Sequence, residues 1–337
     1  MLDQDLRMKV LITGASGFIG SAVLRVILRA GYEARTLLRP TSDRRNIEGL
    51  PVEIVPGDLK DRASLDRALK GCEGLFHVAA DYRLWVPNPP VMYENNVGGT
   101  VNIMEAALHA GVKRVVYTSS VATLGLRKDG GPADETTPVT LDDMIGHYKR
   151  SKFLAEGEVL RMVDQEGLPA VIVNPSTPVG PRDMKCTPTG RMILQAASGR
   201  MPAYVDTGLN LVHVDDVAKG HMLAFKKGRA GERYILGAQD LPFKEILVEL
   251  AAITGKAVPR MRLPHNLVLP MAYIAETWAR LMGSRQPLLT ISGARLAKKR
   301  MFFSSEKARR ELGYSTRPVN EALRDAVNWF KENGYLH

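Results

Sequence analysis

The sequence predicts an α/β fold, with a doubly wound parallel sheet followed by a smaller, partly interwoven substrate-binding part. Two observations lead to this fold class. Short apolar runs alternate with amphipathic stretches through the first half of the chain, which is typical of βαβ units. Proline and glycine then become frequent after Asn174-Pro175, where the alternation stops. We expect residues 1–174 to form the first domain, with segments near 209–228 returning to it, and residues 175–337 to form mainly the second.

The strands expected in the first half are short and rich in β-branched residues, as buried parallel strands are. They are residues 8–12, 33–38, 52–56, 74–79, 114–119 and 169–174. Helices are expected between them near 18–30, 61–70, 92–110 and 148–166. The C-terminal half predicts helices near 190–199, 215–227, 243–254, 265–282 and 320–333, and strands near 209–213 and 233–236.

The turn after the first strand holds three glycines, in the order strand, glycine turn and helix that begins a Rossmann-type dinucleotide-binding fold. Gly14 would permit the tight turn, Gly17 would let amides approach a pyrophosphate, and Gly20 would let the helix pack closely on the sheet. The pyrophosphate would lie at the helix N-terminus, where unpaired N–H groups favour an anion. An ordinary glycine turn is the alternative, which the position at the first strand disfavours. Further cofactor contacts are expected from Ser16, Phe18 and Ile19.

Tyr148 and Lys152 stand four residues apart near the start of a predicted helix, so that both side chains leave the same helix face. A free tyrosine has a pKa near ~10 and is a poor acid–base group at neutral pH. A lysine beside it favours the phenolate and lowers that pKa, so the pair can move a proton to or from a hydroxyl or carbonyl. An isolated tyrosine and lysine at this spacing usually lie on a solvated helix face. Here the glycine turn of a dinucleotide-binding fold precedes them, which favours a catalytic role.

Four further segments occur in the order found in the extended short-chain dehydrogenase/reductases (the NAD-dependent epimerase/dehydratase family), which the chain resembles over most of its length. They are Gly57-Asp58-Leu59, Phe76-His77-Val78-Ala79-Ala80, Tyr117-Thr118-Ser119-Ser120 and His213-Val214-Asp215-Asp216. The segments FHVAADYRLW, DMIGHYKRSKFLAE, VNPSTPVGPRD and KRMFFSS look most like the hopanoid-associated sugar epimerase group, which is similar to dihydroflavonol-reductase-like enzymes. The resemblance implies an NAD(P)-dependent oxidoreductase, with a link to hopanoid lipid metabolism.

The resemblance assigns a catalytic role to each of three residues. Ser120 would donate its hydroxyl to the substrate oxygen as charge develops there. Tyr148 would transfer the proton, and Lys152 would hold the nicotinamide ribose while lowering the Tyr148 pKa. A hydride would pass between the nicotinamide and a secondary alcohol or ketone carbon. Thr118 and Ser119 compete with Ser120 for its role, and alignment to the family motif selects Ser120.

Arg39 follows the second expected strand, where an acidic residue serves the ribose hydroxyl of NAD(H) and a cation serves the 2′-phosphate of NADP(H). We therefore favour NADP(H). NAD(H) is the alternative, with Arg39 stacked on adenine and Asp43 or a water molecule serving the ribose. The resemblance adds cofactor contacts at Asp58, Leu59, Ala79, Ala80, Asn96, Ser119 and Pro175. Asp58 could instead cap a helix, and Asn96 could equally be a buried residue bonded to backbone.

The substrate is expected to be a small molecule, lipidic or polyol-bearing. The loop Asp81-Tyr82-Arg83-Leu84-Trp85 follows the fourth strand and is expected to line its pocket. Candidate substrate contacts are Asp81, Tyr82, Ser120, Asn174 and Arg182. Many sugar-nucleotide members carry an arginine where Asn174 stands, which puts a nucleotide-sugar substrate in doubt. The alternatives are a sugar epimerase or dehydratase with retained NAD and a non-catalytic NAD(P)-binding sensor.

The composition is that of a soluble globular protein, with 337 residues of which 45% are hydrophobic and 24% charged. No apolar run could cross a bilayer and no signal-peptide pattern opens the chain, so we expect a cytoplasmic protein with at most peripheral membrane contact through residues 267–283. Cys72 and Cys186 have no metal-ligand spacing, so no metal is expected. The net charge of +10 is scattered, which argues against nucleic acid as a partner. The resemblance suggests a homodimer.

Overall fold

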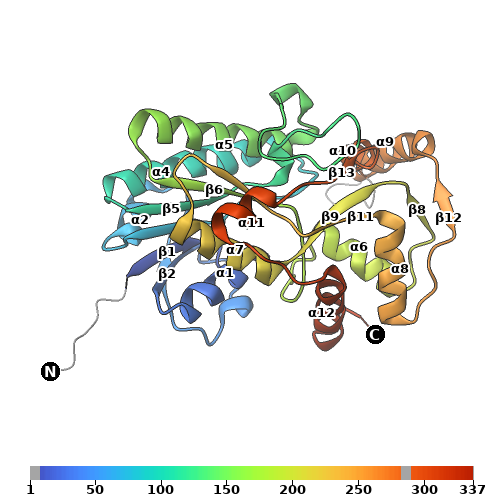
Figure 1. The fold of residues 1–337 in the computed structure, drawn as a ribbon, viewed down its shortest axis with the longest axis horizontal. Coiled ribbons are helices and arrows are strands. Elements are labelled where there is room, and N and C mark those ends of the chain that lie inside the picture. Colours follow the sequence, from blue (N-terminus) through green and yellow to red (C-terminus); the bar gives the residue numbers. More distant parts are fainter. Residues whose placement is uncertain (1–7, 282–289, 337) are drawn as a thin grey trace.

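The computed structural model describes residues 8–281 and 290–336, and it has the doubly wound α/β architecture that the sequence predicts (Figure 1). Seven strands form one parallel sheet of order β10-β6-β5-β4-β1-β2-β3. They are β1 (Lys9–Thr13), β2 (Glu33–Leu38), β3 (Val52–Pro56), β4 (Gly74–His77), β5 (Arg114–Thr118), β6 (Ala170–Pro175) and β10 (Arg233–Leu236). The winding reverses between β1 and β4, and such sheets bind ligands outside the carboxyl ends of the strands at that point.

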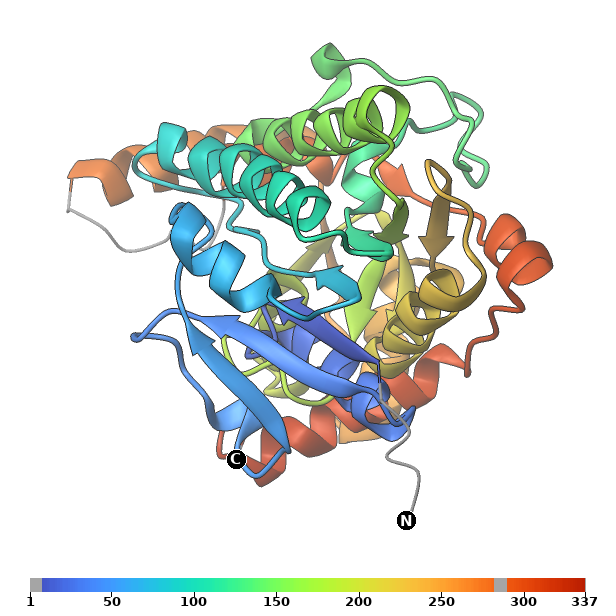
Figure 2. The ribbon, with the colours of Figure 1, turned by 90° about the vertical axis from the view of Figure 1, so that its left-hand side faces the viewer.

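Helices cover both faces of this sheet (Figure 2). One face carries α2 (Arg62–Leu69), α4 (Gly99–His109) and α5 (Gly146–Glu166), and the other carries α1 (Phe18–Arg29), α7 (Val214–Lys227) and α11 (Glu306–Leu312). Each face has its own apolar cluster, because Leu11 of β1 packs into one while Val10 and Ile12 pack into the other. The strands therefore consist of nearly continuous apolar residues, as strands buried on both faces do.

The C-terminal half builds two small sheets of its own. A four-stranded sheet contains β7 (Thr177–Val179), β9 (Gly208–His213), β11 (Gln239–Pro242) and β13 (Arg300–Met301), and a pair is formed by β8 (Ala203–Val205) and β12 (Met261–Leu263). The helices of this half are α6 (Pro188–Ala197), α8 (Phe243–Thr254), α9 (His265–Leu281), α10 (Ile291–Leu296) and α12 (Val319–Glu332). Helices α6, α8 and α12 share an apolar cluster with the four-stranded sheet.

The chain returns from the second half to the first sheet more than once. Within residues 209–228, β9 lies in the four-stranded sheet, whereas α7 packs against α1. The strand β10 then becomes the seventh strand of the parallel sheet, beside β6, and α11 packs against α7. The sequence predicts a strand at residues 233–236 but not its place in the first sheet. The division of the chain into two domains stays a prediction.

The helix expected over residues 92–110 is interrupted. The short α3 (Pro89–Tyr93) is followed by a π-helical turn, Glu94–Gly98, before α4 begins. Such turns re-aim side chains inside a helix and are frequent at functional sites. None of the helices in the described residues is both long and apolar enough to span a bilayer.

Candidate active site

In the glycine turn between β1 and α1, backbone segments lie so close together that two of the glycines have no room for a side chain. Gly14 has a φ of +73°, and a Cβ there would lie 2.7 Å from the backbone nitrogen of Ala79. A Cβ on Gly20 would overlap the carbonyl oxygen of Gly14. The amide of Gly17 donates to the same carbonyl over 2.9 Å. Side chains at the first and third glycines would therefore force the turn apart.

The N-terminus of α1 is left open toward this turn. Gly17 is its N-cap residue, no side chain caps the helix, and its first turn holds no acidic residue. The first N–H groups of a helix have no partner within the helix, and together with the dipole they favour an anion. The start of α1 thus suits the pyrophosphate of a dinucleotide, with Ser16, Phe18 and Ile19 around it.

Buried polar side chains hold the residues that follow β4 next to the glycine turn. The hydroxyl of Thr13 lies 2.8 Å from Nδ1 of His77 and accepts from the amide of Ala79 over 3.2 Å. Nε2 of His77 lies 3.1 Å from the hydroxyl of Thr100. Burial lowers the pKa of His77 to about 3, so the ring is neutral and acts as a structural link. Ala79 is held against Gly14, whereas Ala80 is exposed.

The residues after β3 include Asp58 and Leu59, which are expected to contact the adenine of the cofactor. Asp58 accepts from the amide of Lys60 over 3.0 Å, while Asp61 caps α2 by accepting from Ala63. Asp58 is therefore not the cap of α2, although its carboxylate still bonds the backbone of the loop, and its contact with the cofactor stays a prediction. Leu59 lies close to Gly99, since a Cβ on that glycine would be 3.0 Å from the Leu59 Cβ.

Arg39 directly follows β2, and its side chain is exposed. Among the described residues it forms no ion pair, whereas the competing carboxylate of Asp43 is bound by Arg45 over 2.6 Å. Hydrogen bonding to Arg45 lowers the pKa of Asp43 to about 2. The carboxylate that would serve the ribose of NAD(H) is thus already paired, while a cation suited to a phosphate is available.

The three predicted catalytic residues converge where β5 ends and α5 begins. The Ser120 hydroxyl accepts from the amide of Ala122 over 3.1 Å, which holds it at the end of β5. Burial raises the pKa of Tyr148, and a side-chain hydrogen bond with Ser120 acts in the opposite direction. Lys152 is 2% exposed and donates to the hydroxyl of Tyr117 and the carbonyl of Thr118, each over 2.9 Å.

The pKa values in this group differ from the simplest expectation. The effect of burial on Tyr148 outweighs the hydrogen bond with Ser120, so its pKa lies above the usual value. The sequence predicts a lowered pKa, and the difference arises because Lys152 points to Tyr117 and Thr118 and is itself buried. Burial lowers the pKa of Lys152 to about 7, against an opposing effect of Glu156. Its ammonium and amine forms are therefore both populated near neutral pH.

A buried network braces Ser120 from behind. The side-chain nitrogen of Asn174 donates to the Ser120 carbonyl over 3.1 Å and to the Glu156 carboxylate over 2.9 Å. Thr123 donates to the same carboxylate over 2.9 Å, and Arg233 approaches it to 3.5 Å. Asn174 has no exposed surface, so the structure does not support it as a substrate contact. Its neighbour in β6, Pro175, is also buried.

Asn96 lies in the π-helical turn and is 2% exposed. Its side-chain oxygen accepts from the amide of Asp81 over 2.7 Å, and its nitrogen donates to the Asp81 carbonyl over 2.8 Å and to Ser151 over 2.9 Å. Ser151 in turn bonds the carbonyl of Tyr148. Of the two interpretations that the sequence left equal, this geometry supports the residue bonded to backbone. Asn96 ties the loop after β4 to the helix that carries Tyr148.

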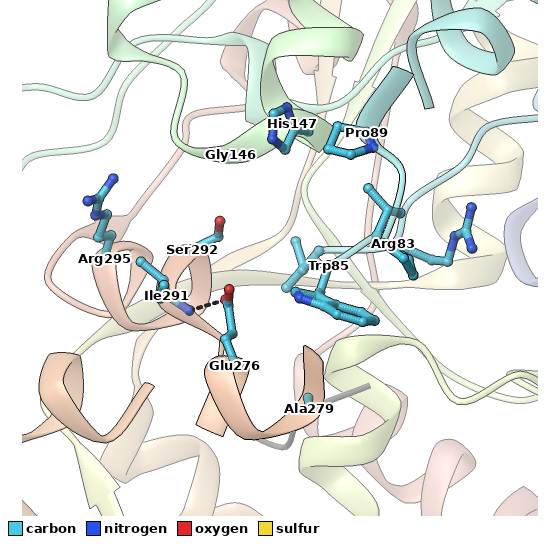
Figure 3. Close-up of a pocket in the computed structure, with 13 residues that line it drawn as sticks. Arg83, Trp85, Pro89, Gly146, His147, Glu276, Ala279, Ile291, Ser292 and Arg295 are labelled. Carbon is cyan, nitrogen blue, oxygen red and sulfur yellow. Dashed lines mark hydrogen bonds between the residues drawn. The ribbon is translucent and has the colours of Figure 1, made fainter. Parts of the chain in front are cut away.

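A cavity of about 680 Å³ opens beside the start of α5 (Figure 3). Its lining comes from the loop after β4 (Arg83, Leu84, Trp85, Val86, Pro87), from Pro89, from Gly146 and His147, and from Glu276, Ala279, Ile291, Ser292 and Arg295 of α9 and α10. Tyr148 follows His147 directly in α5. Most lining side chains of the loop are apolar, so the cavity suits a hydrophobic substrate.

Several predicted substrate contacts lie elsewhere. Asp81 and Tyr82 come just before the loop residues that line the cavity, and they do not line the cavity themselves. The Asp81 carboxylate is paired with Arg83 over 2.5 Å. Arg182 forms an ion pair with Asp215, and its carbonyl accepts from Asn46, which also bonds the carbonyl of Ser16. This places Arg182 beside the glycine turn, away from the cavity.

Sequence reasoning missed the contributions of α10 and of Glu276 to the cavity. The carboxylate of Glu276 is 6% exposed and accepts from the amide of Ile291 over 2.6 Å, which joins α9 to α10 (Figure 3). Such a contact depends on two helices meeting, and periodicity within one helix cannot indicate it. The described residues contain no cluster of three or more His, Cys, Asp or Glu side chains arranged to bind a metal ion.

Comparison with known proteins bears on this geometry. The profile of the "NAD dependent epimerase/dehydratase family" matches residues 10–237. A Synechocystis protein described as "Putative dihydroflavonol 4-reductase" is 44% identical over 96% of this chain and 95% of its own length. "Sterol demethylase protein B" of Methylococcus capsulatus is 35% identical over 98% of this chain and 100% of its own length. The crystal structure of gox2253 has a TM-score of 0.88 and 54% identity, covering 97% of this chain and 99% of that one.

Proposed function

Since the chain belongs to the NAD-dependent epimerase/dehydratase family and is an NAD(P)-dependent extended short-chain oxidoreductase, we propose that it is an NADP(H)-dependent reductase of a lipid-type ketone. The reverse reaction oxidises the matching secondary alcohol. The observation that supports the proposal is that Ser120 follows β5, where Lys152 of α5 bonds the carbonyl of Thr118, and that Tyr148 follows a residue of α5 that lines the cavity.

Four features fit the cofactor. Gly14 and Gly20 form a cradle that a Cβ would fill, and α1 presents an uncapped N-terminus to an anion. The exposed Arg39 suits a 2′-phosphate, because a guanidinium can bind a phosphate through two donors. Asp43, which would serve the ribose of NAD(H), is paired with Arg45. These contacts favour NADP(H) over NAD(H).

The chain's own residues handle the substrate oxygen and its proton. The bound nicotinamide supplies the hydride in reduction and accepts it in oxidation. Tyr148 donates its phenolic proton to the carbonyl oxygen during reduction, and the Ser120 hydroxyl donates a hydrogen bond to the same oxygen. Lys152, in its ammonium form, donates to the nicotinamide ribose and stabilises the phenolate that Tyr148 becomes.

The apolar part of the cavity lining supports a lipid-type substrate. Leu84, Trp85 and Val86 line one side, and Ala279 and Ile291 line the side toward α9 and α10. The Methylococcus relative is described as a sterol demethylase protein, and the Synechocystis relative as a putative dihydroflavonol 4-reductase. A cyclic lipid ketone, of the kind found in sterol or hopanoid metabolism, combines the apolar body and the carbonyl that this site requires.

The test is a spectrophotometric assay of NADPH consumption with a series of cyclic ketones of increasing hydrophobicity. The proposal predicts turnover that rises with hydrophobicity and a preference for NADPH over NADH. The same enzyme is incubated with nucleotide sugars. Inversion of a sugar without net NADPH consumption, together with no turnover of any ketone, would replace this proposal with a sugar epimerase.

A further inference from the structure

Helix α9 exposes four large apolar side chains along one stripe. Leu267, Met271, Ile274 and Trp278 are 56%, 49%, 71% and 65% exposed. Their spacing of four, three and four residues puts them on one face of the helix. Scattered apolar residues on a surface need no explanation, but a contiguous stripe marks an interaction site. We call these four residues the α9 stripe.

The α9 stripe is distinct from the face by which the helix is anchored. Val268 and Ala272 are buried against Ala294 of α10, and Glu276 accepts from the amide of Ile291. The helix therefore already has its packing partner, so the exposed stripe is not part of this anchoring contact.

The surroundings of α9 carry strong positive charge. Between residues 260 and 300, the cations whose side chains the structure describes are Arg260, Arg262, Arg295, Lys298, Lys299 and Arg300, whereas Glu276 is the sole acidic residue of that interval and is buried. Arg262 and Arg300 pair with Asp206. The guanidinium of Arg295 lies 3.5 Å from the hydroxyl of Tyr273, so this cation directly adjoins α9.

We propose that α9 docks on the surface of an anionic lipid bilayer. The α9 stripe enters the boundary between headgroups and acyl chains, and the neighbouring cations contact anionic headgroups. A second copy of the chain fits this surface less well. In a two-fold contact through α9, Asp206 pairs only with Arg262 and Arg300 on each copy, so the remaining cations of the two copies would face one another.

Docking places the bilayer next to the cavity of the proposed active site. Glu276 and Ala279 line that cavity from α9 (Figure 3), and Trp278 of the stripe stands between them in sequence. A lipid-type substrate would then pass between membrane and cavity with little exposure to water. This consequence rests on the proposed function, whereas the docking itself does not.

The experiment is co-sedimentation of the full chain with vesicles of phosphatidylcholine, with and without phosphatidylglycerol. The double variant Ile274→Glu/Trp278→Glu is compared with Val248→Glu, a matched control on α8 whose wild-type side chain is 47% exposed. We expect binding to the anionic vesicles that weakens when salt is raised from about 0.1 M to about 1 M. The double variant should bind at least about tenfold more weakly, and the control as the wild type does.

Two further measurements distinguish membrane docking from misfolding of the variant and from dimerisation. Thermal unfolding shows that the double variant is folded, and its turnover of a water-soluble ketone should equal that of the wild type. Equal binding of wild type and double variant to anionic vesicles would overturn the proposal. So would light scattering that shows a dimer which the double variant dissociates. Vesicle binding without any ketone turnover would contradict only the proposed function, and turnover without vesicle binding only the docking.

Discussion

The cofactor side of the seven-stranded sheet and the cavity beside α9 are built in different ways. At the cofactor side, backbone meets backbone, and the glycine turn leaves no space for a side chain at Gly14 or Gly20. At the cavity, the lining comes from a loop and from helices far apart in the sequence, with exposed apolar residues nearby. The first region is fixed by local geometry, and the second by how distant segments meet. The structure therefore restricts the class of cofactor much more than the class of substrate.

The largest expected effect comes from the residue at which the two regions meet. In Tyr148→Phe, the phenolic proton donor is lost while the ring that fills the site remains. We expect kcat to fall by roughly 10²–10⁴-fold, with little change in NADPH affinity. Steady-state kinetics and fluorescence titration of NADPH measure the two quantities. Tyr32→Phe, which alters a ring packed edge-on against Phe225 on the other face of the sheet, is the matched control and should leave both unchanged.

The cofactor side is tested next by Arg39→Ala. Loss of a charge-assisted hydrogen bond costs about 1.5–3 kcal/mol, so the KM for NADPH should rise by roughly 10–100-fold. The KM for NADH, which lacks the 2′-phosphate, should stay within about twofold of its value. Arg127→Ala, which removes an exposed arginine paired only with Asp129, serves as the control for a general loss of charge. Equal changes for the two coenzymes would show that Arg39 does not read the phosphate.

Two glycine substitutions distinguish the steric effect of a closely packed backbone on stability from the ordinary effect of helix propensity. Gly20→Ala makes a Cβ overlap a carbonyl oxygen and should destabilise the fold by about 1–3 kcal/mol. Gly157→Ala, in α5, meets no atom within 4 Å and should stabilise it by up to about 1 kcal/mol. Chemical denaturation of both variants gives the comparison. A Gly20→Ala variant as stable as the wild type would mean that the turn is not constrained as described.

The smallest expected effect is a shift in the pH profile. Glu156 acts to raise the pKa of Lys152, which burial lowers to about 7. In Glu156→Gln that support is lost, so the Lys152 pKa falls and its ammonium form persists only to a lower pH. Because the ammonium form supports catalysis in our proposal, the alkaline limb of kcat against pH should move to lower pH. A limb that stays in place, with kcat reduced at every pH, would instead indicate a purely structural role for Glu156.

The same contrast explains which features could be predicted from the sequence. The step from β1 through Gly14 to α1 depends on neighbours in the chain, so strand, turn and helix are all predicted close to their observed bounds. The two- and three-residue strands β13 and β8 are too short to show alternation. The π-helical turn at Glu94–Gly98 shifts hydrogen bonding by one residue, and the sequence pattern over residues 92–110 does not indicate it.

The site shows the same limit at the level of single residues. The catalytic roles of Ser120, Tyr148 and Lys152 stay predictions, and the motifs do not indicate that Lys152 bonds Tyr117 in this structure. Asn174 is expected at the substrate, and its position in a strand buried on both faces turns its amide toward Glu156 instead. Arg182 has a φ of +77° and an ion pair with Asp215, neither of which sequence spacing can indicate.

The most direct test of hydride transfer uses NADPH that carries deuterium on the transferred position of its nicotinamide ring. The enzyme is incubated with a cyclic lipid ketone, and the product is analysed by mass spectrometry. We predict one deuterium on the new carbinol carbon and one NADP⁺ formed for each alcohol. An alcohol without deuterium, or a stereochemically inverted product with no NADPH consumed, would contradict hydride transfer to a ketone as the reaction of this protein.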